Sequence, residues 1–109
     1  MSESVDLLHR LVVRNATQPE IVRLYSILRV ESLYPGHLAH DYFRDRDASV
    51  LRSFATLFTG HVTTPEAFAR QLLALMGGLE EQWMRDPGGI DFVAEWDAAM
   101  ATLLGGALL

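Results

Sequence analysis

The most suggestive polar cluster of the sequence holds His37 and His40, three residues apart and followed directly by Asp41. Two imidazoles at this spacing, beside a carboxylate, could share a metal ion. A zinc site needs three or four ligands, however, and the other histidines, His9 and His61, lie far away in the sequence. The H-E-x-x-H pattern is also absent. We therefore expect no metal site, with His37 as a turn residue and His40 as a packed or solvated side chain.

No motif typical of an enzyme active site is found. Glu80 and Glu81 are adjacent on a predicted helix, so their carboxylates point in different directions and are poorly placed to act as a paired acid and base. The G-x-S-x-G elbow, the glycine-rich phosphate loop and the Rossmann fingerprint are absent. The charged run 44–47 is typical of a solvated helix face. We predict that the chain is not an enzyme and needs no cofactor.

Large apolar and aromatic side chains on several predicted helices could bind a small apolar molecule. Such side chains line cavities between the helices of bundles, and buried tyrosine hydroxyls need hydrogen-bond partners. Ordinary core packing is the alternative for each of these residues. The residues that we predict to line a ligand cavity are Tyr25, Leu28, Tyr42, Phe43, Phe54, Phe58 and Met76.

Apolar residues recur at helical spacing along the whole chain, and no stretch shows the alternation of a strand. The sequence therefore predicts an all-α fold. Ser4 and Asp91 are candidate N-caps, and Thr17 and Thr63 each open a T-x-x-E capping box. Caps and helix breakers divide the chain into five predicted helices, at about Ser4 to Arg14, Thr17 to the break at Tyr34, about Leu38 to Thr59, Thr63 to about Arg85, and Asp91 to about Leu104.

The length of 109 residues predicts a single domain, residues 1–109, and a composition that is 50% hydrophobic and 21% charged is that of a globular protein. The sequence has no cysteine, no apolar run of the ~20 residues that cross a bilayer, and no secretion signal at its start. We therefore expect a cytoplasmic protein without membrane contact.

The charges of the chain are unevenly distributed. Residues 1–60 hold seven arginines and seven acids, whereas residues 61–109 hold two arginines and seven acids, and the net charge is −5. Non-specific DNA binding depends on clustered basic residues. The sequence contains no such cluster and no lysine, so we do not expect this chain to bind DNA by itself.

The last two predicted helices are apolar around most of their circumference. A domain of five helices has too few others to cover both, and exposed apolar surfaces of that extent mark interfaces. The Asp-Pro-Gly-Gly turn at 86–89 makes them an antiparallel hairpin, and two such hairpins related by a two-fold axis give a four-helix seam. We predict a homodimer, with a wide-cored monomer as the alternative. The predicted seam residues are Phe68, Leu72, Leu75, Leu79, Trp83, Trp96, Met100 and Leu103.

Three stretches together resemble the C-terminal, ligand-binding and dimerisation domain of TetR-type transcriptional regulators. They are Arg23–Leu33, Tyr34–Phe43 and Ala69–Pro87, and they follow one another in the order and at the spacing of the family. The second is similar to the family's P-D-H-P-A-H-x-Y-F segment. The third is similar to its A-x-x-L-L-A-L-x-x-G-L-x-x-Q-W helix, which a D-P turn follows. Leu38 stands where the family often has proline, and Gly77 where a larger or acidic residue is common.

The resemblance implies the effector-sensing module of a repressor, a homodimer whose last two helices form the seam and whose first four enclose a cavity for a small-molecule effector. In such regulators the ligand changes the spacing of two DNA-reading heads. The family's N-terminal helix-turn-helix domain is missing from this sequence. We therefore expect contact with DNA only through such a domain, and either an excised fragment or a regulator without its reader head. The alternative is a stand-alone helical dimer that binds a ligand or a protein without acting on DNA.

Overall fold

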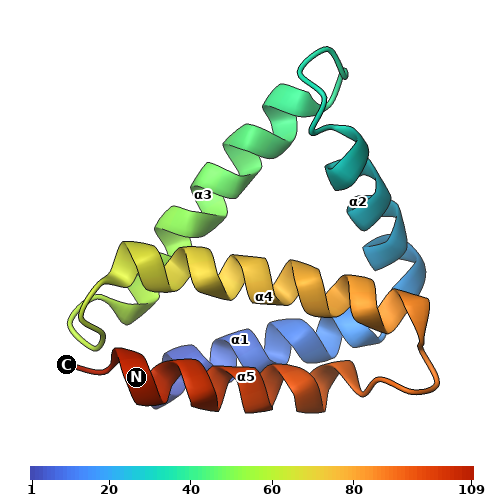
Figure 1. The fold of residues 1–109 in the computed structure, drawn as a ribbon. Coiled ribbons are helices and arrows are strands. Elements are labelled where there is room, and N and C mark those ends of the chain that lie inside the picture. The colour runs from blue at the N-terminus through green and yellow to red at the C-terminus, as the bar shows by residue number, and fades with distance from the viewer.

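Five α-helices make up the fold in a computed structural model that describes residues 1–109 (Figure 1). They are α1 (Ser2–Ala16), α2 (Pro19–Glu31), α3 (His40–Phe58), α4 (Pro65–Arg85) and α5 (Phe92–Ala107). The all-α prediction with five helices is confirmed, and each helix lies within a few residues of its expected range. None of them is both long and apolar enough to span a lipid bilayer.

The helices form a flat triangle with overall dimensions of 40 × 33 × 19 Å (Figure 1). α5 lies against both α1 and α4 along the base of this triangle. α2 and α3 rise from the two ends of the base and meet at loop 32–39. α4, with 21 residues, is the longest helix and contacts α2, α3 and α5, so it joins the rising helices to the base.

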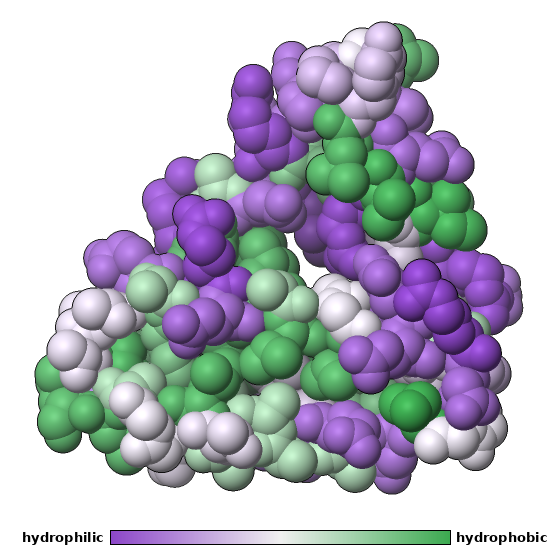
Figure 2. Space-filling view, viewed as in Figure 1, coloured by the Kyte–Doolittle hydropathy of each residue, from purple (hydrophilic) through white to green (hydrophobic).

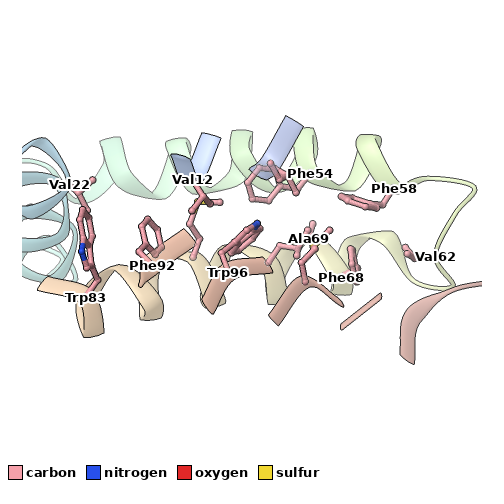
Figure 3. Packing of buried hydrophobic residues seen from close by; sticks show 14 residues of the cluster. Val12, Val22, Phe54, Phe58, Val62, Phe68, Ala69, Trp83, Phe92 and Trp96 are labelled. Atoms are coloured by element: carbon pink, nitrogen blue, oxygen red, sulfur yellow. The ribbon is translucent and has the colours of Figure 1, made fainter. Parts of the chain in front are cut away.

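The hydrophobic core lies in the base of the triangle (Figure 3). Phe58 of α3 packs edge to face on Phe68 of α4, with 4.9 Å between the ring centroids. Complete burial of one large apolar side chain contributes roughly 1.5–3 kcal/mol, so the base provides most of the apolar stabilisation. The largest fully buried side chains are Leu8, Val12, Phe58, Phe68, Leu72 and Trp96.

α4 and α5 form the antiparallel hairpin that the Asp-Pro-Gly-Gly turn predicts. The N–H of Gly89 donates to Asp86 Oδ1 and to the Asp86 carbonyl, both at 3.1 Å. Across the turn the ring of Trp83 stacks on Phe92 at a centroid distance of 5.2 Å. The predicted cap of α5 is confirmed, because Asp91 accepts a side-chain hydrogen bond from a backbone N–H of the first turn.

The other predicted side-chain caps are wrong. Ser4 lies inside α1, and its hydroxyl donates to the Leu57 carbonyl of α3 at 2.9 Å. Thr17 follows α1 as its C-cap, and α2 begins after it without a side-chain cap. The Thr63 hydroxyl lies 3.3 Å from the Ala107 carbonyl, and α4 also lacks a side-chain cap. In each case the hydroxyl donates to a backbone carbonyl instead of accepting from a helix N-terminus.

α5 ends at Ala107, a full turn beyond its expected end. The residues at its C-terminal end pair with the loop that precedes α4, where the Thr63 N–H donates to the Ala107 carbonyl at 2.9 Å. The Leu109 N–H donates to the His61 carbonyl at 3.2 Å. This long-range pairing holds Gly105–Gly106 in the helix, although glycine in a local pattern favours a helix end.

Candidate functional site

A cavity of about 450 Å³ lies at the centre of the triangle, between α1, α2, α3 and α4. Figure 2 shows the hollow between α4 and the two rising helices. Small-molecule sites have volumes of about 300–1,000 Å³, and this cavity lies within that range. Its wall is mixed, because nine of the sixteen lining residues are apolar and six, including Asn15 and Gln18, are polar or charged. Its apolar lining residues are Leu11, Ile21, Val22, Tyr25, Phe43, Val50, Phe54, Leu73 and Met76.

Four charged side chains line the same cavity, one from each helix: Arg14, Arg29, Arg46 and Glu80. Glu80 is only 8% exposed. Burial raises the pKa of the Glu80 carboxyl above its ordinary value, and the positive charges of Arg29 and Arg46 offset only part of this rise. None of the four belongs to an ion pair within 4.0 Å, so the cavity holds charges that no direct contact neutralises.

Gly77 of α4 makes room for the guanidinium of Arg29. A Cβ at position 77 would lie 3.2 Å from Arg29 Nη2 and 3.4 Å from Arg29 Cζ. The absence of a side chain at Gly77 therefore lets the guanidinium approach α4 at the cavity wall.

The adjacent Gly78 offers a matched comparison, because a Cβ there would meet no atom within 4 Å. Glycine inside a helix costs about 1 kcal/mol relative to alanine. Gly78→Ala is therefore expected to raise the free energy of unfolding in urea by up to about 1 kcal/mol. Gly77→Ala should give a smaller gain, because its Cβ must displace Arg29. Equal gains from the two variants would contradict the close approach of Arg29 to α4.

Arg46 of α3 lies over the ring of Tyr25 of α2, with its Cζ 5.6 Å from the ring centroid. An arginine at this distance is attracted to the face of the ring. Tyr25 in turn meets Phe43 edge to face at 6.3 Å, and Phe43 meets Tyr42 at 5.1 Å. This series of rings links α2 to α3 and positions Arg46 at the cavity.

The structure brings together four of the seven predicted ligand-site residues. Phe58 is instead fully buried in the base, Leu28 is half-buried outside the cavity, and Tyr42 is 52% exposed behind Phe43. A helix presents only one side to a cavity, so aromatic residues on its other sides pack elsewhere. The four that line the cavity are Tyr25, Phe43, Phe54 and Met76.

The charged lining residues do not appear among the predicted site residues. A signal for Glu80 exists in the sequence, because it follows Leu72 and Met76 at intervals of four, and residues four apart share one face of a helix. The arginines carry no such signal. They lie on three different helices, and only the triangular arrangement of these helices brings them together.

The predicted dimer-seam residues lie mainly inside the single chain. α1 and α3 cover the inner side of the hairpin. The prediction assumed that the other helices are too few to cover it and therefore assigned these residues to a second copy. A second copy of the chain could contact only the outer side of the hairpin. Leu75, Leu79 and Leu103 are half-buried, whereas the seam residues that are at most 9% exposed are Phe68, Leu72, Trp83, Trp96 and Met100.

The outer side of the hairpin carries a strip of small and uncharged residues, which the exposed charges of Arg70, Arg85 and Glu95 border. A groove of about 300 Å³ runs between α4 and the end of α5, and no charged residue lines it. Figure 2 shows green and white over this part of α4 and α5, at the lower left of the view. We define the outer face of the hairpin as the exposed residues Ala67, Gln71, Ala74, Gly78 and Gln82 of α4 and Ala94, Ala98, Ala101, Thr102, Gly105 and Gly106 of α5.

The two histidines near the start of α3 hydrogen-bond to the backbone. His37 Nδ1 accepts from the Ala39 N–H at 3.0 Å, and His40 Nδ1 donates to the Ser32 carbonyl at 2.7 Å. No group of three potential ligands that could hold a metal ion is present. Both rings therefore act in the turn between α2 and α3, which closes the apex of the triangle.

A second hollow, of about 530 Å³, lies between α2 and the C-terminal end of α4. It is more open than the central cavity, and five of its eight lining residues are polar or charged. Two arginines line it, but Arg23 pairs with Glu20, and Arg85 pairs with Glu81. The central cavity is more enclosed and its charges are unpaired, so it is the better candidate for a ligand site.

Comparisons with protein-family models, with curated proteins and with solved structures find no match for this chain. A helical fold with a cavity is also compatible with many functions. The functional assignment therefore depends on the chemistry of the cavity and on the three stretches that resemble TetR-type regulators.

Proposed function

We propose that residues 1–109 form the effector-binding and homodimerisation domain of a TetR-type transcriptional repressor. A small apolar or amphipathic molecule would bind in the central cavity and control DNA binding by an N-terminal helix-turn-helix domain. The observation that carries this proposal is the cavity itself, which is lined by four of the seven residues expected for a ligand site.

The stretches that resemble the family surround this cavity. Arg23–Leu33 covers most of α2, Tyr34–Phe43 covers the apex loop and the first turn of α3, and Ala69–Pro87 covers most of α4 and the start of the turn. Each stretch contributes a cavity residue, namely Tyr25, Phe43 or Met76. The resemblance and the cavity therefore support the same assignment.

α4 connects the ligand site to the proposed dimer seam. Leu73, Met76 and Gly77 line the cavity on one side of this helix, whereas Ala74 and Gly78 belong to the outer face of the hairpin. Leu73, Ala74, Gly77 and Gly78 also line one groove together with Arg29, so the two surfaces adjoin each other on α4. A ligand that binds one position of α4 better than another would shift the population of dimer geometries.

The mass of the purified chain tests the dimer. At micromolar concentration, light scattering is expected to give twice the 12.2 kDa of one chain. Ala98→Arg places a charge in the outer face of the hairpin, and burying it unpaired in a seam is costly. This variant is therefore expected to be monomeric with unchanged helix content. A stable 12.2 kDa species for the unmodified chain would contradict the proposal.

Ala48→Arg is the matched control for the dimer test. It makes the same substitution at an exposed alanine of α3, outside the hairpin, so it is expected to leave the dimer intact. Trp83 is unsuitable for this test because it is buried within the single chain, and a charge there would disrupt the fold itself. Dissociation by both alanine variants would count against a seam on the outer face.

A further inference from the structure

The arginines of the central cavity differ from most others in the chain. Of the nine arginines, Arg10, Arg23, Arg44 and Arg85 each pair with a carboxylate within 4.0 Å. Three of the remaining five, Arg14, Arg29 and Arg46, line the central cavity. None of these three pairs with an acid. Arg29 is half-buried, whereas Arg14 and Arg46 are exposed at the rim of the cavity.

The charge balance of the lining favours an anion. Glu80 is its only acid, so the three arginines leave a formal excess of two positive charges. This excess occurs in a chain whose net charge is −5. Apolar walls strengthen the field of the half-buried Arg29, whereas solvent partly screens the exposed Arg14 and Arg46. The cavity therefore attracts negative charge mainly through Arg29, although the net charge of the protein is negative.

Two of the guanidiniums are positioned without being neutralised. Arg29 lies close to α4 at Gly77, and Arg46 lies over the ring of Tyr25. Neither contact supplies an acceptor oxygen, so the N–H groups of both remain available to a ligand. A guanidinium presents its N–H groups as a planar fork that matches a carboxylate.

An apolar surface adjoins these guanidiniums. Phe43, Phe54 and Met76 are each 6% exposed and line the same cavity, together with the half-buried Val50 and Leu73. A ligand that contacts both parts must carry an apolar body and a negatively charged head. A purely apolar molecule would leave the guanidiniums unpaired, and a cation would be repelled by them.

We infer that the central cavity binds an amphipathic carboxylate, whose head pairs with Arg29 and Arg46 and whose apolar body packs on Phe43, Phe54 and Met76. This inference rests on the proposed function of the cavity as a ligand site and names the chemical class of its ligand. Arg14 adds a third positive charge from α1. Glu80 opposes the binding of an anion and thereby limits its affinity.

Isothermal titration of the full chain with octanoate, octanol and octylammonium tests this inference, because the three probes share one apolar chain and differ in the charge of the head. Octanoate is expected to bind most tightly. Arg29→Gln and Arg46→Gln should each weaken octanoate about tenfold, the size expected for a lost charged hydrogen bond. Neither variant should change the affinity for octanol. Glu80→Gln removes the opposing charge and should tighten the binding of octanoate.

Arg52→Gln is the matched control, because Arg52 is an exposed arginine of α3 without an ion pair and lies outside the cavity. It should leave octanoate binding unchanged. Gly77→Ala should also weaken octanoate, because its Cβ would press on the guanidinium of Arg29. Thermal melts of each variant show whether the fold is retained.

The outcomes separate this inference from the proposed function. Octanol binding as tightly as octanoate, with no effect of Arg29→Gln or Arg46→Gln, would overturn the carboxylate assignment and leave the cavity as a site for neutral ligands. Tighter binding of octylammonium would overturn it in favour of Glu80 as the recognition group. Absence of binding for all three probes would overturn both the carboxylate assignment and the cavity as an amphipath site.

Discussion

Trp96→Ala is expected to lower the free energy of unfolding by about 3–5 kcal/mol, because replacing a buried tryptophan removes apolar contacts and leaves a cavity. Trp96 is 1% exposed and lies in the packed base of the triangle, close to Val12 and Ala69 (Figure 3). The total stability of a natural domain is about 5–15 kcal/mol. Urea unfolding followed by far-ultraviolet circular dichroism measures the loss.

Tyr34→Ala provides the comparison for Trp96→Ala. Tyr34 is also aromatic but is 73% exposed in the apex loop, and surface substitutions usually change stability by less than about 0.5 kcal/mol. The ratio of the two effects therefore reports on burial and not on the loss of an aromatic ring as such. A loss below about 1 kcal/mol for Trp96→Ala would contradict the position of this residue in the core.

Glu80→Gln is expected to stabilise the ligand-free protein at neutral pH. Burial raises the pKa of the Glu80 carboxyl, so the folded state holds the proton more tightly than the unfolded state does. The stability linked to this group is complete below its ordinary pKa of 4.5 and is lost as the pH rises through the raised value. Glutamine at position 80 cannot ionise, so the variant does not lose this stability as the pH rises.

Melting temperatures measured across the acid range test the role of Glu80. The advantage of Glu80→Gln should be largest at neutral pH and should shrink as the pH falls to 4.5 and below. Glu81→Gln is the control, because this neighbouring carboxylate is more exposed and pairs with Arg85 at 3.8 Å, a surface pair worth about 0–1 kcal/mol. A constant difference between Glu80→Gln and the unmodified chain at all pH values would exclude the predicted linkage.

The helices were predictable because their signals are local. Apolar spacing, the break at 34–36 and the turn at 86–89 act within a few residues, and the five helices follow them closely. The end of α5 was not predictable in this way. It depends on hydrogen bonds from the loop at 61–63, which lies more than forty residues earlier in the chain.

The assignment of apolar faces shows a second limit of the sequence. The stripe that includes Leu72 and Trp96 was correctly identified as requiring burial, but its partners are α1 and α3 of the same chain. Periodicity indicates that a face must be covered and does not indicate what covers it. The light-scattering mass of the unmodified chain and of Ala98→Arg distinguishes coverage within one chain from coverage by a second copy.

The residues of the candidate ligand site also fall into a part that the sequence predicts and a part that it does not. Its aromatic half was predictable, because Tyr25, Phe43 and Met76 are large residues on helices expected to face one another. Its charged half depends on tertiary structure, since Arg29 and Arg46 line the same cavity only because α2 and α3 converge above α4. Sequence patterns on single helices contain no trace of this convergence.

The triangular arrangement has a consequence for the range of molecules that fit. The packed core lies in the base, whereas α2 and α3 are joined near the apex by the Tyr25–Phe43 contact and by the hydrogen bond from His40 to Ser32. Val22 of α2 and Phe54 and Phe58 of α3 belong to the same buried cluster as the base, so spreading these two helices would loosen the packed core. The frame is thus braced at its base as well as at its apex, and the hollow of about 450 Å³ sets the size of the molecules that fit.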